Sequence, residues 1–159
     1  MNRFMDEKWS WIEGSHGMRD EVLELLTDAE LAYAPGGDNM SLGDLLRQMG
    51  EVEHSYLHGL KTLRQNWAYR NTDAGIESSV SRLTGWFHEL DAELQATVGA
   101  FTDDDLAEVV LREESGYTMQ VEMVLDVYIQ ALLIFFGKAV VYLKAMQKPL
   151  PHSVQEWIW

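Results

Sequence analysis

Residues 82–101, RLTGWFHELDAELQATVGAF, carry the clearest helical pattern in this sequence. Apolar side chains recur every three or four positions, so they fall on one side of a helix while the opposite side stays polar. The members of this stripe are Leu83, Trp86, Phe87, Leu90, Leu94, Val98 and Phe101. Because such a stripe must be buried against other elements, it predicts an amphipathic helix in a helical core.

Three further segments show helical periodicity, and turn-forming residues separate them. They run approximately over residues 3–27, 41–65 and 118–146. The stretch 66–78 is polar and the stretch 108–116 has an extended pattern, so both are expected to be connections rather than helices. The sequence therefore predicts an all-α fold, a bundle of four long helices that forms one domain over residues 1–159.

The composition excludes several kinds of partner and site. There are 26 acidic and 12 basic residues, and the formal net charge of -14 repels nucleic-acid phosphates and anionic lipid heads. The absence of cysteine excludes disulfides, thiolate metal ligands and cysteine nucleophiles. The first residues lack the apolar run of a signal peptide. We therefore expect a cytoplasmic protein with neither a nucleic-acid partner nor a membrane partner.

The last predicted helix is apolar on nearly every side, which is unusual at the edge of a monomeric bundle. Its most apolar part, 127–143, is interrupted by Gln130 and Lys138 and is shorter than the roughly 20 residues of a membrane span. We expect one stripe to face the bundle, namely Val124, Val127, Tyr128, Ala131, Phe135 and Tyr142. A second stripe would be exposed in a monomer, namely Leu125, Ile129, Leu132, Phe136, Val140 and Leu143. This pattern predicts a homodimer that packs through the fourth helix.

Two runs of sequence resemble the DinB family: SLGDLLRQMGEVE at 41–53, and GKAVVYLKAM at 137–146 followed by Pro-Leu-Pro at 149–151. The closing Glu156-Trp157-Ile158 is similar too, so the resemblance covers nearly the whole chain. It implies an antiparallel four-helix bundle, often dimeric, with long connections between helices 2 and 3 and between helices 3 and 4. For many members it also implies a divalent metal held by three histidines, and for some a thiol-dependent transferase or isomerase activity.

The three metal-binding positions that this resemblance implies do not hold histidine here. They fall on Gln48 in the second helix and on Ala131 and Phe135 in the fourth. An open zinc or nickel site needs about three nitrogen or oxygen donors, and only Gln48 offers one, a neutral amide oxygen. We therefore expect no metal cofactor, and a small, dry vestigial pocket lined by these three residues with Tyr128 and His16.

Other histidines offer weaker candidates. His16 follows the core side of the first helix, which predicts either a structural histidine or a ligand or acid–base group in the pocket. Glu51, His54 and His58 stand three and four positions apart, a spacing that can bind a metal. They follow a polar stripe rotated away from the core, so we expect a solvent-exposed face there. The polar side of the third helix is expected to carry Thr84, His88, Asp91 and Gln95.

Two functions remain open on these patterns. The preferred hypothesis is a metal-free protein that has kept the bundle and the dimer and acts by binding a small molecule or a partner. The alternative is an enzyme, a metal- or thiol-dependent transferase or hydrolase with non-standard ligands. In that case zinc or nickel would be held by residues such as His16, Gln48 and a carboxylate.

Overall fold

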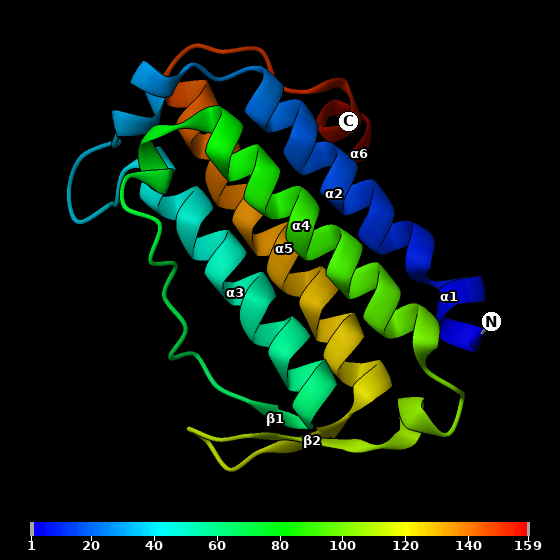
Figure 1. Cartoon of the computed structure of the whole chain (residues 1–159). Coiled ribbons are helices and arrows are strands. Elements are labelled where there is room, and N and C mark those ends of the chain that lie inside the picture. Colours follow the sequence, from blue (N-terminus) through cyan, green and yellow to red (C-terminus); the bar gives the residue numbers. More distant parts are fainter. Residues whose placement is uncertain (1, 159) are drawn as a thin grey trace.

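Four long helices form the bundle in Figure 1, a computed structural model that describes residues 2–158. They are α2 (Trp9–Glu24), α3 (Leu42–Thr62), α4 (Val80–Ala100) and α5 (Val121–Ala145). In the view, α2 and α5 run upward while α3 and α4 run downward, so each member of the first pair is antiparallel to each member of the second. The connection over 63–79 returns along the length of α3, which is why α3 and α4 run in the same direction. The expected four-helix bundle with long connections is confirmed.

The connections hold a small sheet at the lower end of the bundle in Figure 1. Its strands, in the order β1-β2-β3, pair parallel between β1 and β2 and antiparallel between β2 and β3. The expected extended stretch is therefore confirmed as a strand. Thr118, expected to open the last helix, instead begins a strand, and the helix starts at Val121. The strands are β1 (Arg64–Gln65), β2 (Val109–Arg112) and β3 (Thr118–Gln120).

Five short helical pieces complete the fold. The first predicted helix is broken at Lys8, whose φ of -127° leaves the helical region, rather than at its glycines. Gly14 and Gly17 both lie inside α2. The short elements are α1 (Arg3–Glu7), η1 (Asp28–Ala32), η2 (Ile76–Ser78), η3 (Asp105–Ala107) and α6 (His152–Ile158).

The core follows the stripe predicted for α4 and continues on one side of α3. On α4, the apolar positions at the centre of the stripe are fully buried, and Trp86 and Phe101 are half-buried at its edge. Full burial of one large apolar side chain contributes roughly 1.5–3 kcal/mol, so these stripes hold the bundle together. The buried apolar residues of the two helices are Leu42, Leu45, Leu46, Met49, Tyr56, Leu57, Leu60, Leu83, Phe87, Leu90, Leu94 and Val98.

The outer face expected for the last helix is wrong in its residues, whereas Val124, Tyr128 and Tyr142 of the expected bundle face are buried. Leu125, Leu132 and Leu143, expected to be exposed in a monomer, are buried against the bundle. The helix contacts α2, α3 and the sheet, so a wide arc of its surface is covered. By length and composition α5 is the one helix among residues 2–158 that could cross a membrane, and 33% of its most apolar window is buried. The exposed large apolar residues are Met123, Leu133, Ile134 and Val141.

Gly43 makes a close contact that a methyl group would break. A Cβ atom at Gly43 would lie 1.9 Å from the backbone oxygen of Glu77, where the α3–α4 connection crosses α3. We expect Gly43→Ala to lower the free energy of unfolding by about 1–3 kcal/mol, the usual result of overpacking. In the matched variant Gly85→Ala the new Cβ meets open space, so better helix propensity should raise stability by up to about 1 kcal/mol. Urea unfolding measures the stability of both variants. Equal changes in Gly43→Ala and Gly85→Ala would contradict the close contact between Gly43 and Glu77.

Candidate functional site

Five polar side chains meet inside the bundle, on helix faces that otherwise carry apolar residues. His16 and Arg19 come from α2, Glu53 from α3, Asp91 from α4 and Tyr128 from α5. The side chains of Arg19 and Glu53 have no exposed surface, and Tyr128 is 1% exposed. His16 is buried, whereas the Asp91 side chain keeps 21% of its surface exposed. All four long helices therefore contribute to this group, which is called the buried cluster below.

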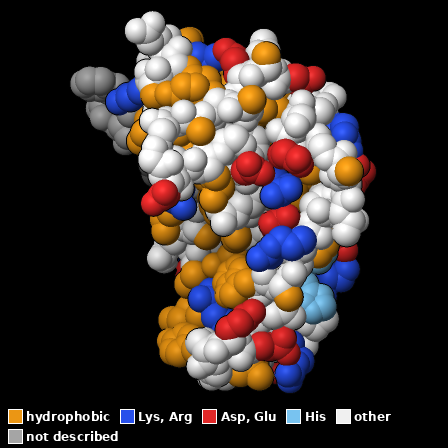
Figure 2. Space-filling view, turned by 90° about the vertical axis from the view of Figure 1, so that its left-hand side faces the viewer, with side chains coloured by type: hydrophobic (Ala, Val, Ile, Leu, Met, Phe, Trp, Pro, Cys, Tyr) orange, Lys and Arg blue, Asp and Glu red, His pale blue; other side chains and the backbone are white. Residues whose placement is uncertain are grey.

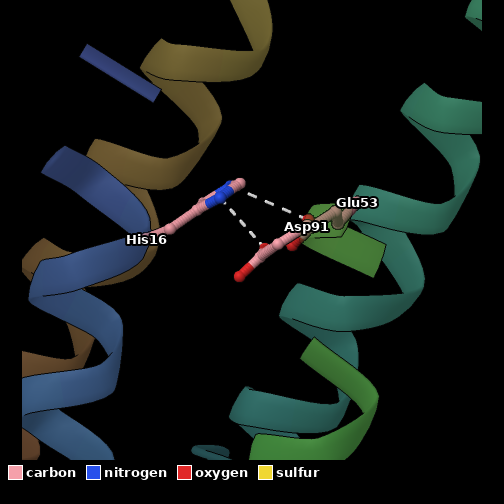
Figure 3. A group of neighbouring side chains, drawn as sticks. All are labelled: His16, Glu53 and Asp91. Carbon is pink, nitrogen blue, oxygen red and sulfur yellow. Dashed lines mark ion pairs between the residues drawn. The ribbon is translucent and has the colours of Figure 1, made fainter. Parts of the chain in front are cut away.

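His16 lies at the centre of the buried cluster and points toward both carboxylates (Figure 3). Its Nδ1 is 3.0 Å from Asp91 Oδ1, and its Nε2 is 3.7 Å from Glu53 Oε1. The same Nε2 forms a 2.8 Å hydrogen bond with the hydroxyl of Tyr128. Burial raises the pKa of Tyr128 well above its ordinary value, so this hydroxyl stays protonated. One imidazole thus connects groups from three other helices.

Arg19 holds the two carboxylates together. Its guanidinium donates to Glu53 Oε2 at 3.2 Å and also to Asp91 Oδ2. The guanidinium carbon lies 4.2 Å from the ring centroid of Phe87, which packs against its flat face. A planar guanidinium can serve two carboxylates and one aromatic ring at once, which a lysine could not do. Arg19 therefore neutralises one of the two negative charges that the carboxylates bring into the core.

The other oxygen of each carboxylate lacks an aligned donor. Glu53 Oε1 and Asp91 Oδ1 are buried and have no hydrogen-bond partner among residues 2–158. The 3.0 Å approach of His16 Nδ1 to Asp91 Oδ1 does not have hydrogen-bond geometry. Leaving a buried acceptor unsatisfied costs roughly 1–3 kcal/mol, so such an oxygen calls for a proton, a water molecule or a cation.

Burial and charge set the protonation of the buried cluster. Burial raises the pKa of Glu53 to about 8, although Arg19 opposes the rise. Burial also acts to raise the pKa of Asp91, but the adjacent His16 ring and the hydrogen bond from Arg19 outweigh it and lower that pKa to about 2. For His16, burial outweighs the attraction of Asp91 and lowers the pKa. At neutral pH the cluster therefore holds a charged Arg19, a charged Asp91 and a protonated Glu53.

The buried cluster can be compared with the needs of a metal ion. His16, Glu53 and Asp91 each offer a ligand atom within 4.8 Å of the others, and nitrogen with carboxylate oxygen is a donor set that zinc accepts. When both carboxylates are ionised, Arg19 leaves the group one negative charge, which a single proton neutralises. A divalent ion would leave one positive charge in the core, where uncompensated charge is unfavourable. The donor types fit a metal, but a proton balances the charge better.

A surface pocket of about 410 Å³ gives the buried cluster access to solvent between α2 and α4. His16 and Asp91 belong to both the pocket and the cluster. Asp91 was expected on an exposed polar face, but it binds Arg19 and His16 instead. His88, from the same expected face, is exposed and pairs with Asp20 at 3.0 Å. The pocket is lined by Trp9, Glu13, His16, Gly17, Asp20, His88, Asp91, Ala92 and Gln95.

The residues expected to line one vestigial pocket are not brought together. His16 and Tyr128 meet in the buried cluster. Gln48 is exposed and lines a separate surface pocket of about 600 Å³. It follows the exposed side of α3 because it is turned about 100° from its buried neighbour Met49. The pocket that Gln48 lines includes neither His16 nor Tyr128.

Ala131 and Phe135 lie in a third place, on α5. Both are half-buried, and Phe135 borders an apolar cavity of about 10 Å³ that also touches Arg19. The ammonium of Lys138 lies 5.4 Å from the centroid of the Phe135 ring. A cavity of this size holds at most one water molecule, so it is no ligand site. The expectation that Ala131 and Phe135 share a single pocket with Gln48 is therefore corrected, because the structure places these residues at separate sites.

The Glu51, His54 and His58 pattern forms no metal group among residues 2–158. Glu51 was expected to face solvent, but it is 8% exposed because the α3–α4 connection covers it, and it accepts from the backbone N–H of Asn71 at 3.1 Å. His54 stacks on Tyr69 of the same connection, with ring centroids 3.5 Å apart. His58 is exposed, as expected. Glu51 therefore helps to hold the α3–α4 connection against α3.

Three members of the buried cluster, Arg19, Glu53 and Asp91, were missed by the reading of the sequence. Their spacing could have identified them as core-facing, since each lies three or four positions from buried apolar residues of its own helix. Charged side chains at such positions have to be paired inside the protein. The runs that carry the signal are Ile12-His16-Arg19-Leu23, Met49-Glu53-Tyr56 and Phe87-Asp91-Leu94.

Comparisons with known proteins find relatives by sequence family and by fold. The family model described as the DinB superfamily matches residues 12–130. The crystal structure of YjoA, a DinB-like protein from Bacillus subtilis, is similar with a TM-score of 0.72 and 15% identity, over 91% of this chain and 95% of that one. YfiT from Bacillus subtilis, described as a probable metal-dependent hydrolase with an unusual four-helix bundle topology, has a TM-score of 0.72 and 13% identity, over 94% and 91%. Among curated proteins, none matches this chain. At these identities the structural likeness concerns the fold alone.

Proposed function

This chain belongs to the DinB superfamily. We propose that it is a metal-free member of that superfamily and binds a small molecule. The observation that carries the proposal is the pocket of about 600 Å³ along α3, a volume typical of small-molecule sites. It lies between α3 and the α3–α4 connection, on the face shown in Figure 2, where charged side chains of both signs alternate with apolar ones. Its lining residues are Met40, Asp44, Arg47, Gln48, Glu51, Val52, Ser55, Trp67 and Arg70.

The charges in this pocket are already paired. Arg47 lies 3.2 Å from Asp44, 3.7 Å from Glu51 and 3.5 Å from Glu77. Arg70 lies 3.9 Å from Glu51. A ligand with a large net charge would have to break one of these ion pairs, whereas a neutral or zwitterionic ligand would not. The pocket therefore favours a polar molecule without net charge.

Trp67 supplies an aromatic wall for the same pocket. Tyr56 packs edge-on against its ring with centroids 5.5 Å apart, and the Arg112 guanidinium lies 5.6 Å from the indole. Because the ring is held in place, a flat ligand could stack on it with little loss of entropy. Gln48, where the family resemblance implies a histidine, contributes an amide that both donates and accepts hydrogen bonds. The proposed ligand is thus flat, polar and neutral overall.

We expect benzamide, a neutral planar amide, to bind in this pocket of the wild-type protein. In a titration followed by ¹⁵N NMR, the Trp67 indole and the Gln48 amide should shift more with benzamide than with the anion benzoate. Gln48→Trp should remove the shifts, because the larger side chain fills the pocket. Glu89→Trp is the matched control, since Glu89 is exposed on α4 and does not line the pocket. Shifts that persist in Gln48→Trp, or no shifts in wild type with neutral aromatic amides, would overturn the proposal.

A second candidate function is metal-dependent hydrolysis at the buried cluster. It is favoured by the donor set of His16, Glu53 and Asp91, and YfiT is described as a probable metal-dependent hydrolase. These three residues would hold zinc or nickel, which would supply an activated water molecule. Arg19 would orient both carboxylates, and the pocket between α2 and α4 would admit the substrate.

Metal analysis separates the two functions. After incubation with zinc or nickel and gel filtration, we expect well under one metal ion per chain, because Arg19 and a proton already balance the carboxylates. Elemental analysis of the untagged protein is the measurement. The hydrolase function would be favoured by close to one ion per chain, lost in Asp91→Asn and retained in Gln48→Ala. That result would contradict the metal-free proposal.

A further inference from the structure

Unpartnered polar atoms gather around the pocket between α2 and α4. Among the side chains that the structure describes, eight buried nitrogen or oxygen atoms have no hydrogen-bond partner, and three of these atoms belong to residues that line this one pocket. They are Trp9 Nε1, Asp20 Oδ1 and Asp91 Oδ1. Because buried polar groups are rarely left unpaired, three of them around one pocket indicate a site that a ligand completes.

The pocket is elongated and lies between two helices that run side by side in Figure 1. Residues 9, 13, 16, 17 and 20 of α2 face residues 88, 91, 92 and 95 of α4 across it, at the three- and four-residue spacing of a single helix face. From Trp9 to Asp20, α2 advances by about 16 Å. The volume of about 410 Å³ is typical of small-molecule sites. An elongated molecule therefore fits this pocket better than a compact one.

Two neighbouring carboxylates form the inner end of the pocket. The same guanidinium nitrogen of Arg19 binds Asp91 Oδ2 and lies 3.6 Å from Asp20 Oδ1, which places the two acidic side chains close together. His88 occupies the other oxygen of Asp20, at 3.0 Å. Asp91 is ionised at neutral pH because its pKa is lowered to about 2, so its unpartnered oxygen needs a donor from outside. An ammonium group has three N–H donors and can serve both carboxylates at once.

The charge at this end of the pocket favours one positive charge. Arg19 offsets one of the two carboxylates, and Glu53 behind it holds a proton because burial raises its pKa to about 8. Burial lowers the pKa of His16, which keeps that ring neutral at pH 7. None of the described residues that line the pocket is a lysine or an arginine. A single ammonium therefore balances the remaining negative charge, whereas an anion would add to it.

Trp9 provides a hydrogen-bond donor at the other end of the pocket. It is 8% exposed, and its indole N–H has no hydrogen-bond partner among residues 2–158. Because an indole N–H can only donate, it requires an acceptor such as a hydroxyl or carbonyl oxygen. Between the two ends, the small residues Gly17 and Ala92 leave room for a chain of methylene groups. A molecule that completes all three atoms thus has an ammonium at one end and a neutral oxygen at the other.

We propose that this pocket binds a linear primary amine whose far end carries a neutral hydrogen-bond acceptor. The ammonium contacts Asp20 and Asp91, and the acceptor binds the indole N–H of Trp9. The site is separate from the pocket along α3, so this inference does not depend on the proposed function. It requires no metal ion, and a metal bound to Asp91 would compete with the amine.

The affinity for 4-amino-1-butanol tests the chemical class of the ligand. Calorimetric titration of the full chain at pH 7, with EDTA present, should show tighter binding of 4-amino-1-butanol than of pentylamine, in which a methyl group replaces the hydroxyl. Binding should also be tighter than that of 1,4-butanediol, which lacks the positive charge. In ¹⁵N NMR the Trp9 indole signal should shift more with the amino alcohol than with pentylamine. Equal affinity for the three compounds, or no binding of 4-amino-1-butanol at millimolar concentration, would overturn the proposal.

Two glycines of α2 provide a matched pair of variants that leaves every charge in place. Gly14 and Gly17 are both exposed and have open space where a Cβ would be, but of the two only Gly17 lines the pocket. Gly17→Leu should fill the pocket and lower the affinity for 4-amino-1-butanol at least about tenfold, whereas Gly14→Leu should change it less than about twofold. Circular dichroism checks that the helices stay intact. If both variants kept the wild-type affinity, the amine would not bind in this pocket.

Asp20→Asn tests the contact with the ammonium. The Asp20 side chain keeps 34% of its surface exposed, so the variant should fold. Loss of the charge-assisted hydrogen bond should lower the affinity for 4-amino-1-butanol about tenfold. Asp38→Asn is the matched control, because Asp38 is exposed and does not line the pocket. An equal affinity of the two variants would contradict the assigned position of the ammonium.

Discussion

Arg19→Met is expected to lower the free energy of unfolding by about 3 kcal/mol, the lower end of the cost of breaking a buried ion pair. The lower end applies because Glu53 is protonated at neutral pH and Asp91 keeps part of its surface in water. The substitution keeps an apolar side chain of similar length against Phe87, so the loss reports mainly the missing charge. Urea unfolding at pH 7 is the measurement, with an unchanged dependence on urea as the sign that the fold is intact.

A surface ion pair provides the comparison for this result. Arg82 is 42% exposed and pairs with Asp73, so Arg82→Met should cost at most about 1 kcal/mol. Adding Asp91→Asn to Arg19→Met should recover part of the stability, because it removes the carboxylate that lost its partner. If Arg19→Met cost no more than Arg82→Met, the buried cluster would not depend on Arg19 for its charge balance.

The contribution of Glu53 to stability should fall as the pH rises from about 4.5 to 8, and Glu53→Gln should remove that contribution. Burial raises the pKa of Glu53 from its ordinary 4.5 to about 8. In that window the folded chain holds a proton that the unfolded chain has released, so raising the pH favours unfolding, by at most about 1.4 kcal/mol per pH unit. Glutamine stays neutral at every pH and cannot contribute this dependence. Unfolding free energies at pH 5, 6, 7 and 8 measure the two slopes.

Asp91, rather than Glu53, affects stability at acidic pH. Because the pKa of Asp91 is lowered to about 2, its contribution is present above the ordinary value of 3.8 and is lost as the pH falls toward 2. The two windows do not overlap, so they can be measured apart. Glu89→Gln, at an exposed position, should keep the wild-type slope between pH 5 and 8. A slope in Glu53→Gln equal to that of wild type would show that Glu53 does not hold the proton.

The helices themselves were determined by local sequence. The stripe that begins at Leu83 predicted α4, and Ser41 with Asp44 marks the start of α3, where the Ser41 hydroxyl accepts from the Asp44 N–H at 3.1 Å. Periodicity and capping act within a few residues, so a sequence shows them directly. The same local reading showed that Gln48, Ala131 and Phe135 cannot supply three metal donors.

Other features depended on residues far apart in the chain. Glu51 lies on a polar stripe, and only the α3–α4 connection that covers it makes it buried. The exposed face of α5 could not be found from periodicity, because a helix that is apolar on nearly all sides has no preferred face until its neighbours cover part of it.

The buried cluster shows most clearly which features the sequence determined and which only the tertiary structure decided. The sequence by itself determined that His16 follows the core side of its helix, and the spacing of Arg19, Glu53 and Asp91 contained the same information. Only the tertiary structure decided that side chains from α2, α3 and α4 converge on one point beside Tyr128. Whether a buried charge is paired depends on how helices are aligned along the bundle, and that alignment is set by packing among all four of them rather than by any one stretch of sequence.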